Sequence, residues 1–374
     1  MVAAIVACSI TLASTGLMAE QSQDRSAEPA PVGPHGSVEA RTSEMIKRLA
    51  RTWFKEEWRA YRTAFVSPEG RIVDNGSGGV SHSEGQGYGL LLAALADDPD
   101  QFQLIWRWTQ SHLKVRPDNL LAWRWNPADG SADKNNATDG DILVAWALAE
   151  GARRFGRSDY LAAAKSIAEA IGAQTIKSAG GRLVLLPGVD GFDAKAQPDG
   201  PVVNLSYWVF PAFDALRDLA PQYDWSKVSL EGLKMLSESR FGPLRLPADW
   251  QSAKEATPRP AKNFRAEFGY NAIRLPLYLA WKGDAESLRA LRRFTGLWSD
   301  QSAPGPFVID VATGSAGQTL DGAGYKLPIA LARCATLGRE IDPDLTKTRD
   351  QLYYPATLRM LSLAIIQERF PQCL

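Results

Sequence analysis

The chain has 374 residues, 45% of them hydrophobic, and its 42 basic residues equal its 42 acidic residues in number. This length is enough for a large hydrophobic core in one domain or two. A net charge of zero removes the global electrostatic attraction on which nucleic-acid and acidic-lipid binding depend, so we expect no nucleic-acid partner and an uncharged ligand. Three histidines and three cysteines without metal-ligand spacing argue against a metal site, and no motif indicates a cofactor.

The N-terminal residues are typical of an export signal. Residues 1–19 hold an apolar run followed by small residues, with a cleavage site expected after Ala19. The missing basic region leaves open a start further upstream or a membrane anchor. Residues 20–39, rich in Pro, Ser and Glu, predict a flexible lead, and residues 40–374 a single folded domain. We therefore expect an exported protein, periplasmic or secreted, in which Cys334 and Cys373 are either paired or free buried thiols.

From residue 40 onward the apolar residues recur with the period of α-helices. The predicted helices cover residues 41–62, 84–97, 99–115, 139–155, 158–176, 204–220, 226–240, 268–282, 284–298, 322–338 and 352–370. Alternating β character is confined to short segments such as residues 182–188 and 306–310, which excludes a parallel sheet with helical crossovers. The fold class predicted is therefore all-α.

The helices are of two kinds. Those that begin near Asp141 and Asn271 are apolar on nearly every side and must be surrounded by protein, whereas residues 41–62 and 284–298 are amphipathic. Alternation of the two kinds suggests two concentric rings of helices. The loops at one end, rich in Gly, Trp and Asp, would then line a cleft.

The segment VSHSEGQGYG, residues 80–89, allows two interpretations. Ser81 and Glu84 fit a capping box, in which both side chains bond to free amides of the first helical turn. That reading does not explain the glycines at 85, 87 and 89, each of which weakens a helix by roughly 1 kcal/mol relative to alanine. The glycines indicate that another chain or a bulky ligand approaches the backbone beside Glu84.

Two further segments carry charged residues at helix starts. In NNATDGDILVAW, Asp139 and Asp141 are two positions apart and cannot share a helix face, so we assign Asp139 to the cleft and Asp141 to support of the turn. In AEFGYNAIRLPLYLAW, Arg274 lies among apolar residues and needs an acidic partner. That partner is either an acidic residue in a purely structural ion pair or a carboxylate of the cleft.

Five segments in this order resemble glycoside hydrolase family 8: SHSEGQGYGLLLA, LLAWRWNP, NNATDGDILVAWAL, VVNLSYW and FGYNAIRLPLYLAW. The likeness covers residues 50 to 365 and is closest to endoglucanases encoded alongside bacterial cellulose synthase. It implies an (α/α)6 barrel that cleaves β-1,4 links with inversion of the anomeric configuration. By motif match it implies Glu84 as general acid, Asp139 beside the central sugar, Trp123 as a stacking platform and Tyr207 near the scissile bond.

One position departs from the family pattern. Many members have Tyr-Asp-Ala-Ile-Arg with the aspartate as general base, whereas this chain has Asn271, and an amide cannot take a proton from water at neutral pH. Either Asn271 only orients the water and another carboxylate is the base, or the enzyme is slow, or the base lies elsewhere. We favour the first account with Asp139 as the base; weaker candidates are Glu267, Asp249 and Asp199.

The chemistry sets what the site must provide. Inversion needs a protonated acid and a second carboxylate roughly 6.5–9.5 Å apart. Glu84 has to keep its proton although a helix N-terminus favours the ionised form, so burial and a neighbouring Asp139 must oppose the helix dipole. The glycines would leave room for a glucan chain past Glu84. The substrate-binding residues predicted are Tyr88, Trp123, Trp125, Asp141, Tyr207, Trp208 and Arg274.

The function expected from the sequence is thus an exported endo-β-1,4-glucanase, linked to cellulose synthesis or degradation. Its expected partners are a β-1,4-glucan substrate and, as a candidate, a cellulose synthase complex, with the protein itself a monomer. The alternatives are the same fold acting on xylan, mixed-linkage β-glucan or chitosan, or a barrel that binds glucan without cutting it.

Overall fold

A computed structural model of the chain describes residues 38–298 and 305–374, with side chains from Thr52 onward. The described residues up to residue 45 and those from residue 46 onward belong to two separate units, and each is considered by itself. The predicted export signal and all but two residues of the predicted lead lie outside the described residues. Helix α1 (Val38–Phe65) begins at the end of that lead.

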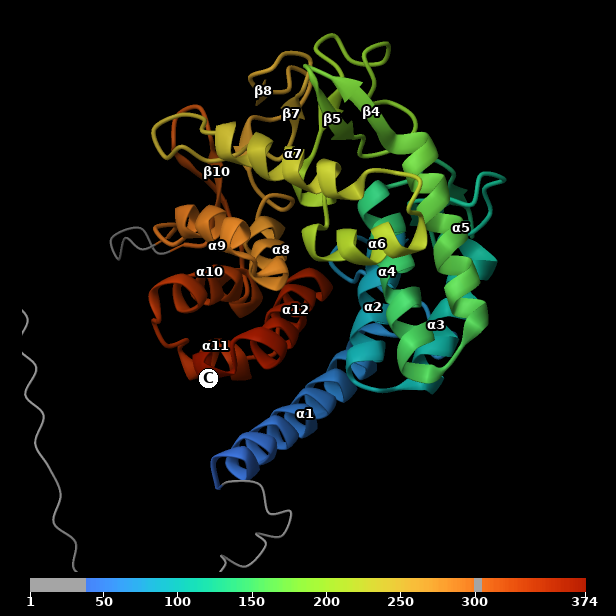
Figure 1. Cartoon of the computed structure of the whole chain (residues 1–374), viewed down its shortest axis with the longest axis vertical. Helices are drawn as coiled ribbons and strands as arrows, with labels where there is room; N and C mark the ends of the chain where they lie inside the picture. Colours follow the sequence, from blue (N-terminus) through green and yellow to red (C-terminus); the bar gives the residue numbers. More distant parts are fainter. Residues whose placement is uncertain (1–37, 299–304) are drawn as a thin grey trace, which may run out of the picture. The chain divides into compact units, whose positions relative to one another are not determined.

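Within the described residues of the larger unit, six helices form an inner ring (Figure 1). They are α2 (Ser83–Leu95), α4 (Thr138–Phe155), α6 (Phe213–Leu219), α8 (Arg274–Lys282), α10 (Ala323–Leu337) and α12 (Tyr353–Arg369). Helix α2 packs against α4 and α12, α4 against α6, and α8 against α10 and α12. A short 3-10 turn, η2 (Phe210–Ala212), bridges α6 to α8.

The other helices lie outside this ring. They are α3 (Pro99–His112), α5 (Ser158–Thr175), α7 (Trp225–Glu238), α9 (Ala285–Leu291) and α11 (Pro343–Lys347). Each packs on the inner helix that precedes it in the chain, and α1 contacts α12, so inner and outer helices alternate. The predicted double ring is confirmed.

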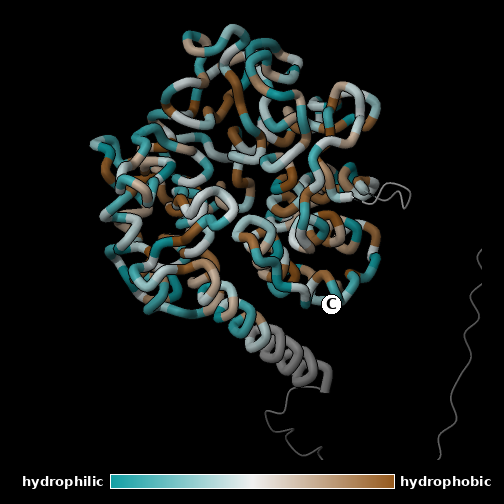
Figure 2. The backbone as a smooth tube through the Cα atoms, turned by 180° about the vertical axis from the view of Figure 1, so that it is seen from behind, coloured by the Kyte–Doolittle hydropathy of each residue, from teal (hydrophilic) through white to brown (hydrophobic). Residues whose placement is uncertain are grey.

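Burial explains which helix belongs to which ring. Helix α12 is buried at almost every position from Tyr353 to Ile366, whereas α3 buries one face and exposes the other. Figure 2 shows the same distribution, with hydrophobic segments inside and hydrophilic segments at the periphery. Within the described part of the chain, none of the helices has both the length and the apolarity that crossing a membrane requires.

Two predicted helices begin later than the pattern indicated. In the range 204–220, Asn204 caps a 3-10 turn, η1 (Leu205–Tyr207), and Pro211 lies in η2, so the α-helix starts only at Phe213. In the range 268–282, Asp249 accepts the backbone N–H groups of Gly269 and Ala272, which holds a turn ahead of α8. A side chain distant in sequence thus delays this helix, and local periodicity does not reveal it.

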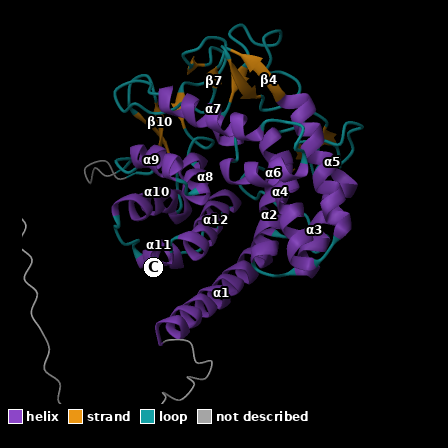
Figure 3. Ribbon diagram, in the orientation of Figure 1, coloured by secondary structure: helices purple, strands orange, loops and turns teal. Residues whose placement is uncertain are grey.

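Short antiparallel strands form four small sheets among the described residues. Their members are β1 (Ser81–His82), β2 (Arg124–Trp125) and β3 (Ala132–Asp133); β4 (Ile176–Ala179) and β5 (Arg182–Leu185); β6 (Val202–Val203), β7 (Gln251–Ser252) and β8 (Arg259–Pro260); and β9 (Glu267–Phe268), β10 (Phe307–Asp310) and β11 (Ala316–Thr319). The β segments predicted at 182–188 and 306–310 correspond to β5 and β10. Figure 3 shows β4, β7 and β10 together at one end of the helices.

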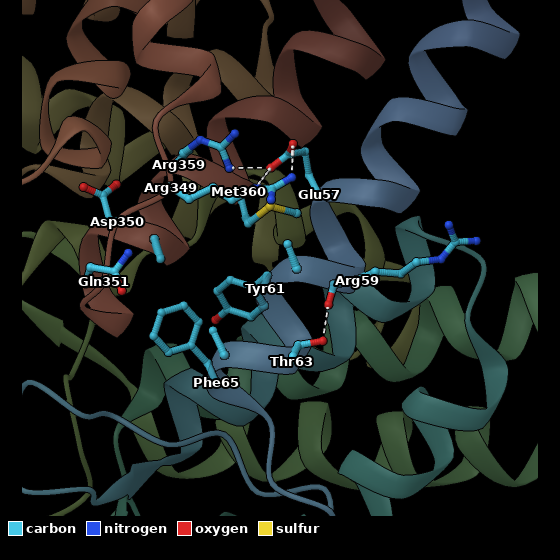
Figure 4. Close-up of a pocket in the computed structure, with 13 residues that line it drawn as sticks. Glu57, Arg59, Tyr61, Thr63, Phe65, Arg349, Asp350, Gln351, Arg359 and Met360 are labelled. Carbon is cyan, nitrogen blue, oxygen red and sulfur yellow. Dashed lines mark hydrogen bonds and ion pairs between the residues drawn. The ribbon is translucent and has the colours of Figure 1, made fainter.

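The first and last helices close the ring (Figure 4). The buried Glu57 of α1 pairs with Arg349 at 3.0 Å and with Arg359 of α12 at 2.9 Å. The Tyr61 hydroxyl lies 2.8 Å from that of Thr357. These contacts join segments almost 300 residues apart in sequence.

The two cysteines outside the predicted signal are paired. Cys334 near the end of α10 and Cys373 in the C-terminal 3-10 turn η4 (Pro371–Cys373) form a disulfide with Cα atoms 5.9 Å apart. Both are buried. The alternative of free thiols is therefore wrong for this structure.

Candidate active site

Arg274 is the centre of a buried polar cluster at the end of the barrel where the inner helices begin. It is 2% exposed and lies in the first turn of α8. Its guanidinium donates to the Glu84 carboxylate, to Asp139 at 2.8 Å, to the Asn271 side-chain oxygen at 2.9 Å and to the Ser206 hydroxyl at 3.3 Å. The acidic partner expected for this arginine is thus a pair of carboxylates from α2 and α4.

The arginine keeps its charge inside the protein. Burial alone would lower the pKa of Arg274, but Glu84, the hydroxyl groups of Tyr88 and Tyr354, and Asp139 together outweigh it, so that the pKa is raised well above its ordinary value. The ring of Tyr207 lies beneath the guanidinium, with 5.4 Å between the guanidinium carbon and the ring centroid. A fixed positive charge therefore sits between two acids and a tyrosine.

Glu84 is the member of the cluster that opens onto a cavity. Its side chain is 24% exposed and lines a cavity of about 400 Å³ together with Tyr270, Asn271, Arg274 and Tyr354. This cavity is separate from one of about 500 Å³ between α1 and α12 (Figure 4), which none of the predicted site residues lines. An acid placed this way can reach a bound molecule.

The capping box predicted at the start of α2 is absent. The helix begins at Ser83, and its N-cap residue His82 makes no side-chain cap. The Ser81 hydroxyl instead donates to the backbone oxygen of Ile72 at 2.5 Å. The Glu84 carboxylate instead binds the guanidinium of Arg274, which lies in the first turn of α8.

The glycines after Glu84 have a different cause from the one predicted. A Cβ added at Gly87 would lie 2.5 Å from the Leu143 Cβ of α4, and one at Gly89 would lie 2.5 Å from Ile72. Across the same contact, a Cβ at Gly140 would lie 2.0 Å from the Ser83 hydroxyl. Gly87 and Gly140 let α2 and α4 approach closely, and Gly89 makes room for Ile72, so the interpretation that the glycines make room for a glucan is wrong. What they achieve is to bring Glu84 beside Asp139.

Asp139 lies deeper than Glu84. It is 1% exposed, and its second oxygen accepts the Gly140 N–H at 2.8 Å. Burial, with the neighbouring Glu84 as a further cause, raises the pKa of Asp139 to about 7, although Arg274 opposes the rise. Asp139 is therefore buried beneath Glu84 and is not an exposed residue of the cleft.

The two acids share one nitrogen atom. Glu84 and Asp139 each accept a hydrogen bond from the same Nη1 of Arg274. Since a hydrogen bond spans about 3 Å, the nearest oxygens of the two carboxylates lie no more than about 6 Å apart. Inverting pairs need roughly 6.5–9.5 Å to hold a water molecule between them, so this geometry weighs against Asp139 as the partner base of Glu84.

Asp141 supports the site from inside the protein. It is fully buried and accepts the Leu121 N–H and the Asn136 side-chain N–H, both at 2.8 Å. Burial raises the pKa of Asp141 to about 8. The supporting role predicted for this residue agrees with these contacts, and a direct substrate contact does not, because no surface of it is accessible. Its bond to Leu121 fixes the loop that carries Trp123.

Trp123 and Trp125 lie beside Glu84 because β2 pairs with β1, which leads directly into α2. The Trp123 ring stacks on His82 with 5.8 Å between centroids and 17° between planes. Trp125 meets His112 edge-on and carries the Arg71 guanidinium at 5.2 Å from its ring centroid. Both tryptophans are partly exposed, as a sugar platform requires.

Two other aromatic residues that were predicted to contact a sugar belong to the hydrophobic core. Tyr88 is fully buried and its hydroxyl bonds to that of Tyr278. Trp208 is fully buried and donates its indole N–H to the Leu185 oxygen at 3.3 Å. The prediction that these rings contact a sugar is therefore corrected: both side chains fill space between helices, and neighbouring polar residues in the sequence do not indicate exposure.

Asn271 is held from both sides. Its side-chain oxygen faces Arg274, and its side-chain N–H and backbone N–H each point to Asp249 at 3.3 Å. Asp249 is 3% exposed, and burial raises its pKa. Among the other base candidates, Glu267 lies in β9, and Asp199 accepts the Lys262 N–H at 3.0 Å.

Sequence reasoning assigned no role to three aromatic residues near Glu84. Tyr270, Tyr325 and Tyr354 line its cavity, with their ring centroids 5.9–6.2 Å apart. A second group, Trp250 stacked on Phe192 at 5.4 Å, adjoins Tyr207. Tyr325 and Tyr354 stand in the first turns of inner helices, so the rule that inner helix starts share one end would have found them.

Comparisons with known proteins identify the family to which the chain is similar. The sequence pattern described as "Glycosyl hydrolases family 8" matches residues 43–368. A probable endoglucanase of Novacetimonas hansenii is 38% identical over 313 residues, which are 82% of this chain and 89% of that protein. An endoglucanase of Cellulomonas uda is 37% identical over 248 residues, 66% of this chain and 68% of the relative. The solved structure of the endo-β-1,4-glucanase CMCax from Acetobacter xylinum shares 34% identity at a TM-score of 0.73, over 83% of this chain and 97% of that one.

Proposed function

Because the chain belongs to glycosyl hydrolase family 8, we propose that it is an endo-β-1,4-glucanase that cleaves with inversion and uses Glu84 as the proton donor. The observation that carries this proposal is the Glu84 carboxylate, which opens onto a cavity while the buried Arg274 binds both it and Asp139. The similarity to endoglucanases supports the substrate. The tyrosine rings that line the cavity at Glu84, with Trp123 stacked on His82 at the start of α2, support a chain of sugars, whose C–H faces pack on aromatic carbon.

In the proposed reaction, Glu84 gives its proton to the departing glycosidic oxygen. Positive charge then develops on the sugar ring, which Asp139 stabilises from below as the neighbouring carboxylate. Arg274 keeps both acids in place, and the Tyr207 ring beside it closes that side of the site. Asp139 thus acts on charge, a role that its closeness to Glu84 favours over proton abstraction.

We assign the orientation of the attacking water molecule to Asn271. Its amide is fixed by Arg274 and Asp249, so it can orient a water molecule but cannot take a proton. As the water oxygen bonds to the anomeric carbon and the glycosidic C–O bond breaks, the proton of the attacking water therefore passes to solvent water in the cavity. Asp249 accepts N–H groups of Gly269, Asn271 and Ala272, which suits it to holding the amide. A general base typically contributes 10²–10⁴-fold in rate. We therefore expect a functional but slow enzyme.

Export remains part of the proposal. The pair Cys334–Cys373 supports it, since structural disulfides persist in oxidising compartments. A role during cellulose synthesis, beside a synthase complex, rests on the likeness of the five sequence motifs. We propose a monomer that acts on β-1,4-glucan in the periplasm or outside the cell.

The test is release of reducing ends from carboxymethylcellulose by the purified chain. Glu84→Gln is expected to lower the rate by at least 10²-fold, because general acid catalysis contributes about that much. Glu286→Gln is the matched control, since Glu286 lies in the first turn of α9 and is exposed. Tight binding of cellooligosaccharides without turnover by the unmodified chain would instead establish a glucan-binding barrel.

A further inference from the structure

Asp74 is the second acid of the cavity at Glu84. Among the described residues that line this cavity of about 400 Å³, these two are the only carboxylic acids. Asp139 and Asp249 are almost fully buried and do not line it, and Glu267 lines a separate cavity. Besides Glu84, Asp74 is therefore the carboxylate that a proton released in this cavity meets.

One oxygen of Asp74 is available to a water molecule. Its Oδ1 accepts the Gly76 N–H at 3.0 Å. Its Oδ2 makes no hydrogen bond to any residue that the structure describes, and it lies 3.9 Å from His82 Nδ1, beyond hydrogen-bonding distance. The side chain is 12% exposed and lines the cavity. Because Oδ1 is occupied, Oδ2 is the oxygen that can accept a hydrogen bond from water there.

The backbone holds Asp74 in this position. An antiparallel bridge joins it to Val80, and its N–H donates to the Val80 oxygen at 2.9 Å, directly before β1 leads into α2. The next residue, Asn75, donates to the Gln351 oxygen and accepts the Tyr353 N–H, both at 2.9 Å. These bonds tie the loop that carries Asp74 to the starts of α2 and α12.

We propose that Asp74 is the final acceptor of the proton that the attacking water releases. As the water oxygen bonds to the anomeric carbon and the glycosidic C–O bond breaks, Glu84 protonates the departing oxygen. The proton of the attacking water passes through a second water molecule to Oδ2 of Asp74. Afterwards Asp74 loses this proton to solvent and Glu84 takes up a new one, so both acids return to their starting states. The inference rests on the proposed function and accounts for turnover without a carboxylate at position 271.

The first experiment measures kcat on cellopentaose for the full chain and for Asp74→Asn. The amide keeps the size of the side chain and an oxygen for the Gly76 N–H, but it cannot take a proton. A general base contributes typically 10²–10⁴-fold, and a carboxylate that acts through a second water molecule stands at the low end, so we expect kcat to fall about 10²-fold. Asp218→Asn is the control, because it makes the same change at an exposed position of α6.

Two rescues separate uptake of a proton from a structural role. Azide is an anion that attacks carbon without losing a proton, so sodium azide should restore turnover of Asp74→Asn and give an α-glycosyl azide, the product of inversion. Adding Asn271→Asp to the Asp74→Asn variant should also restore kcat, because the new carboxylate takes the proton directly.

The outcomes distinguish the two proposals. An Asp74→Asn variant as fast as the parent, or a loss that neither azide nor Asn271→Asp restores, overturns Asp74 as the proton acceptor while the endoglucanase assignment stands. Failure of the unmodified chain to cleave cellopentaose overturns the proposed function itself. Should Asp74→Asn unfold, Asp74→Ser, whose hydroxyl can still accept the Gly76 N–H, takes its place in the same measurements.

Discussion

At the scale of single residues, the site is organised around Arg274, to which several side chains bind at once. Glu84, Asp139 and Asn271 all bond to it, and each comes from a different segment of the chain. The sequence indicated that this arginine needs an acid, because a buried guanidinium without one is very costly. It could not indicate that two acids would share one nitrogen, since that depends on how closely α2 and α4 approach.

Asn271→Asp tests the assignment of the water. The new carboxylate would supply the missing base, so kcat should rise, by up to about 10²-fold. The position lies between two charged groups: the Arg274 guanidinium at 2.9 Å lowers the pKa of the introduced acid, and the Asp249 carboxylate at 3.3 Å raises it. A base works when deprotonated, so the gain should appear only as pH increases through the pKa of the new carboxylate. A pH–rate profile measures it, and a variant slower than the parent at every pH would contradict the assignment.

Asp139→Asn tests whether Asp139 acts on charge or takes the proton. In either case kcat should fall by at least 10²-fold, because a buried charge next to the reacting sugar is lost. The double variant Asp139→Asn/Asn271→Asp separates the two roles. If Asp139 stabilises charge, a new base at 271 does not restore the rate. Recovery of the rate in the double variant would show that Asp139 is the base.

At the scale of elements, the start of each inner helix carries the chemistry. Helices α2, α4 and α8 place Glu84, Asp139 and Arg274 in their first turns. Periodicity predicted the bounds of α4 and α5 nearly to the residue, because the apolar pattern of each begins and stops where the helix itself begins and ends. It predicted α6 and α8 to begin too early, because Pro211 and the distant Asp249 set those starts. Tyr88 and Trp208 were misplaced since an all-round apolar helix does not reveal which aromatic ring faces a cleft.

Gly87→Ala tests the close contact between α2 and α4. Alanine normally favours a helix over glycine by about 1 kcal/mol, but here its Cβ would meet Leu143 Cβ at 2.5 Å and the Val144 nitrogen at 3.1 Å. We expect a net loss of about 1–3 kcal/mol in the free energy of unfolding, together with a lower kcat as Glu84 moves away from Asp139. Chemical denaturation measures the free energy of unfolding of the variant and of the parent, and a more stable Gly87→Ala protein would refute the packing argument.

At the scale of the whole molecule, contacts near the beginning and the end of the larger unit hold the ring of helices together. Glu57 and Tyr61 join α1 to α12, and the Cys334–Cys373 bond holds the C-terminal turn to α10. The alternation of apolar and amphipathic helices predicted the double ring. The closure was not predictable, because it joins residues almost 300 positions apart through a few polar contacts.

The double variant Cys334→Ser/Cys373→Ser is expected to lower the free energy of unfolding by about 2–4 kcal/mol, since the bond closes a loop across 39 positions. Its kcat at low temperature should stay unchanged, because both cysteines lie away from the cavity at Glu84. Thermal unfolding with and without a reducing agent checks this. An unchanged Tm on reduction would contradict a stabilising role.

The role of Glu84 as proton donor is tested most directly by the dependence of the rate on the leaving group. Glu84→Gln should lose nearly all activity on cellooligosaccharides, whose alkoxide leaving group needs a proton. It should keep most of its activity on an aryl cellooligosaccharide that carries a dinitrophenolate, a group that departs without one. Equal losses on the two substrates would show that Glu84 does not donate the proton.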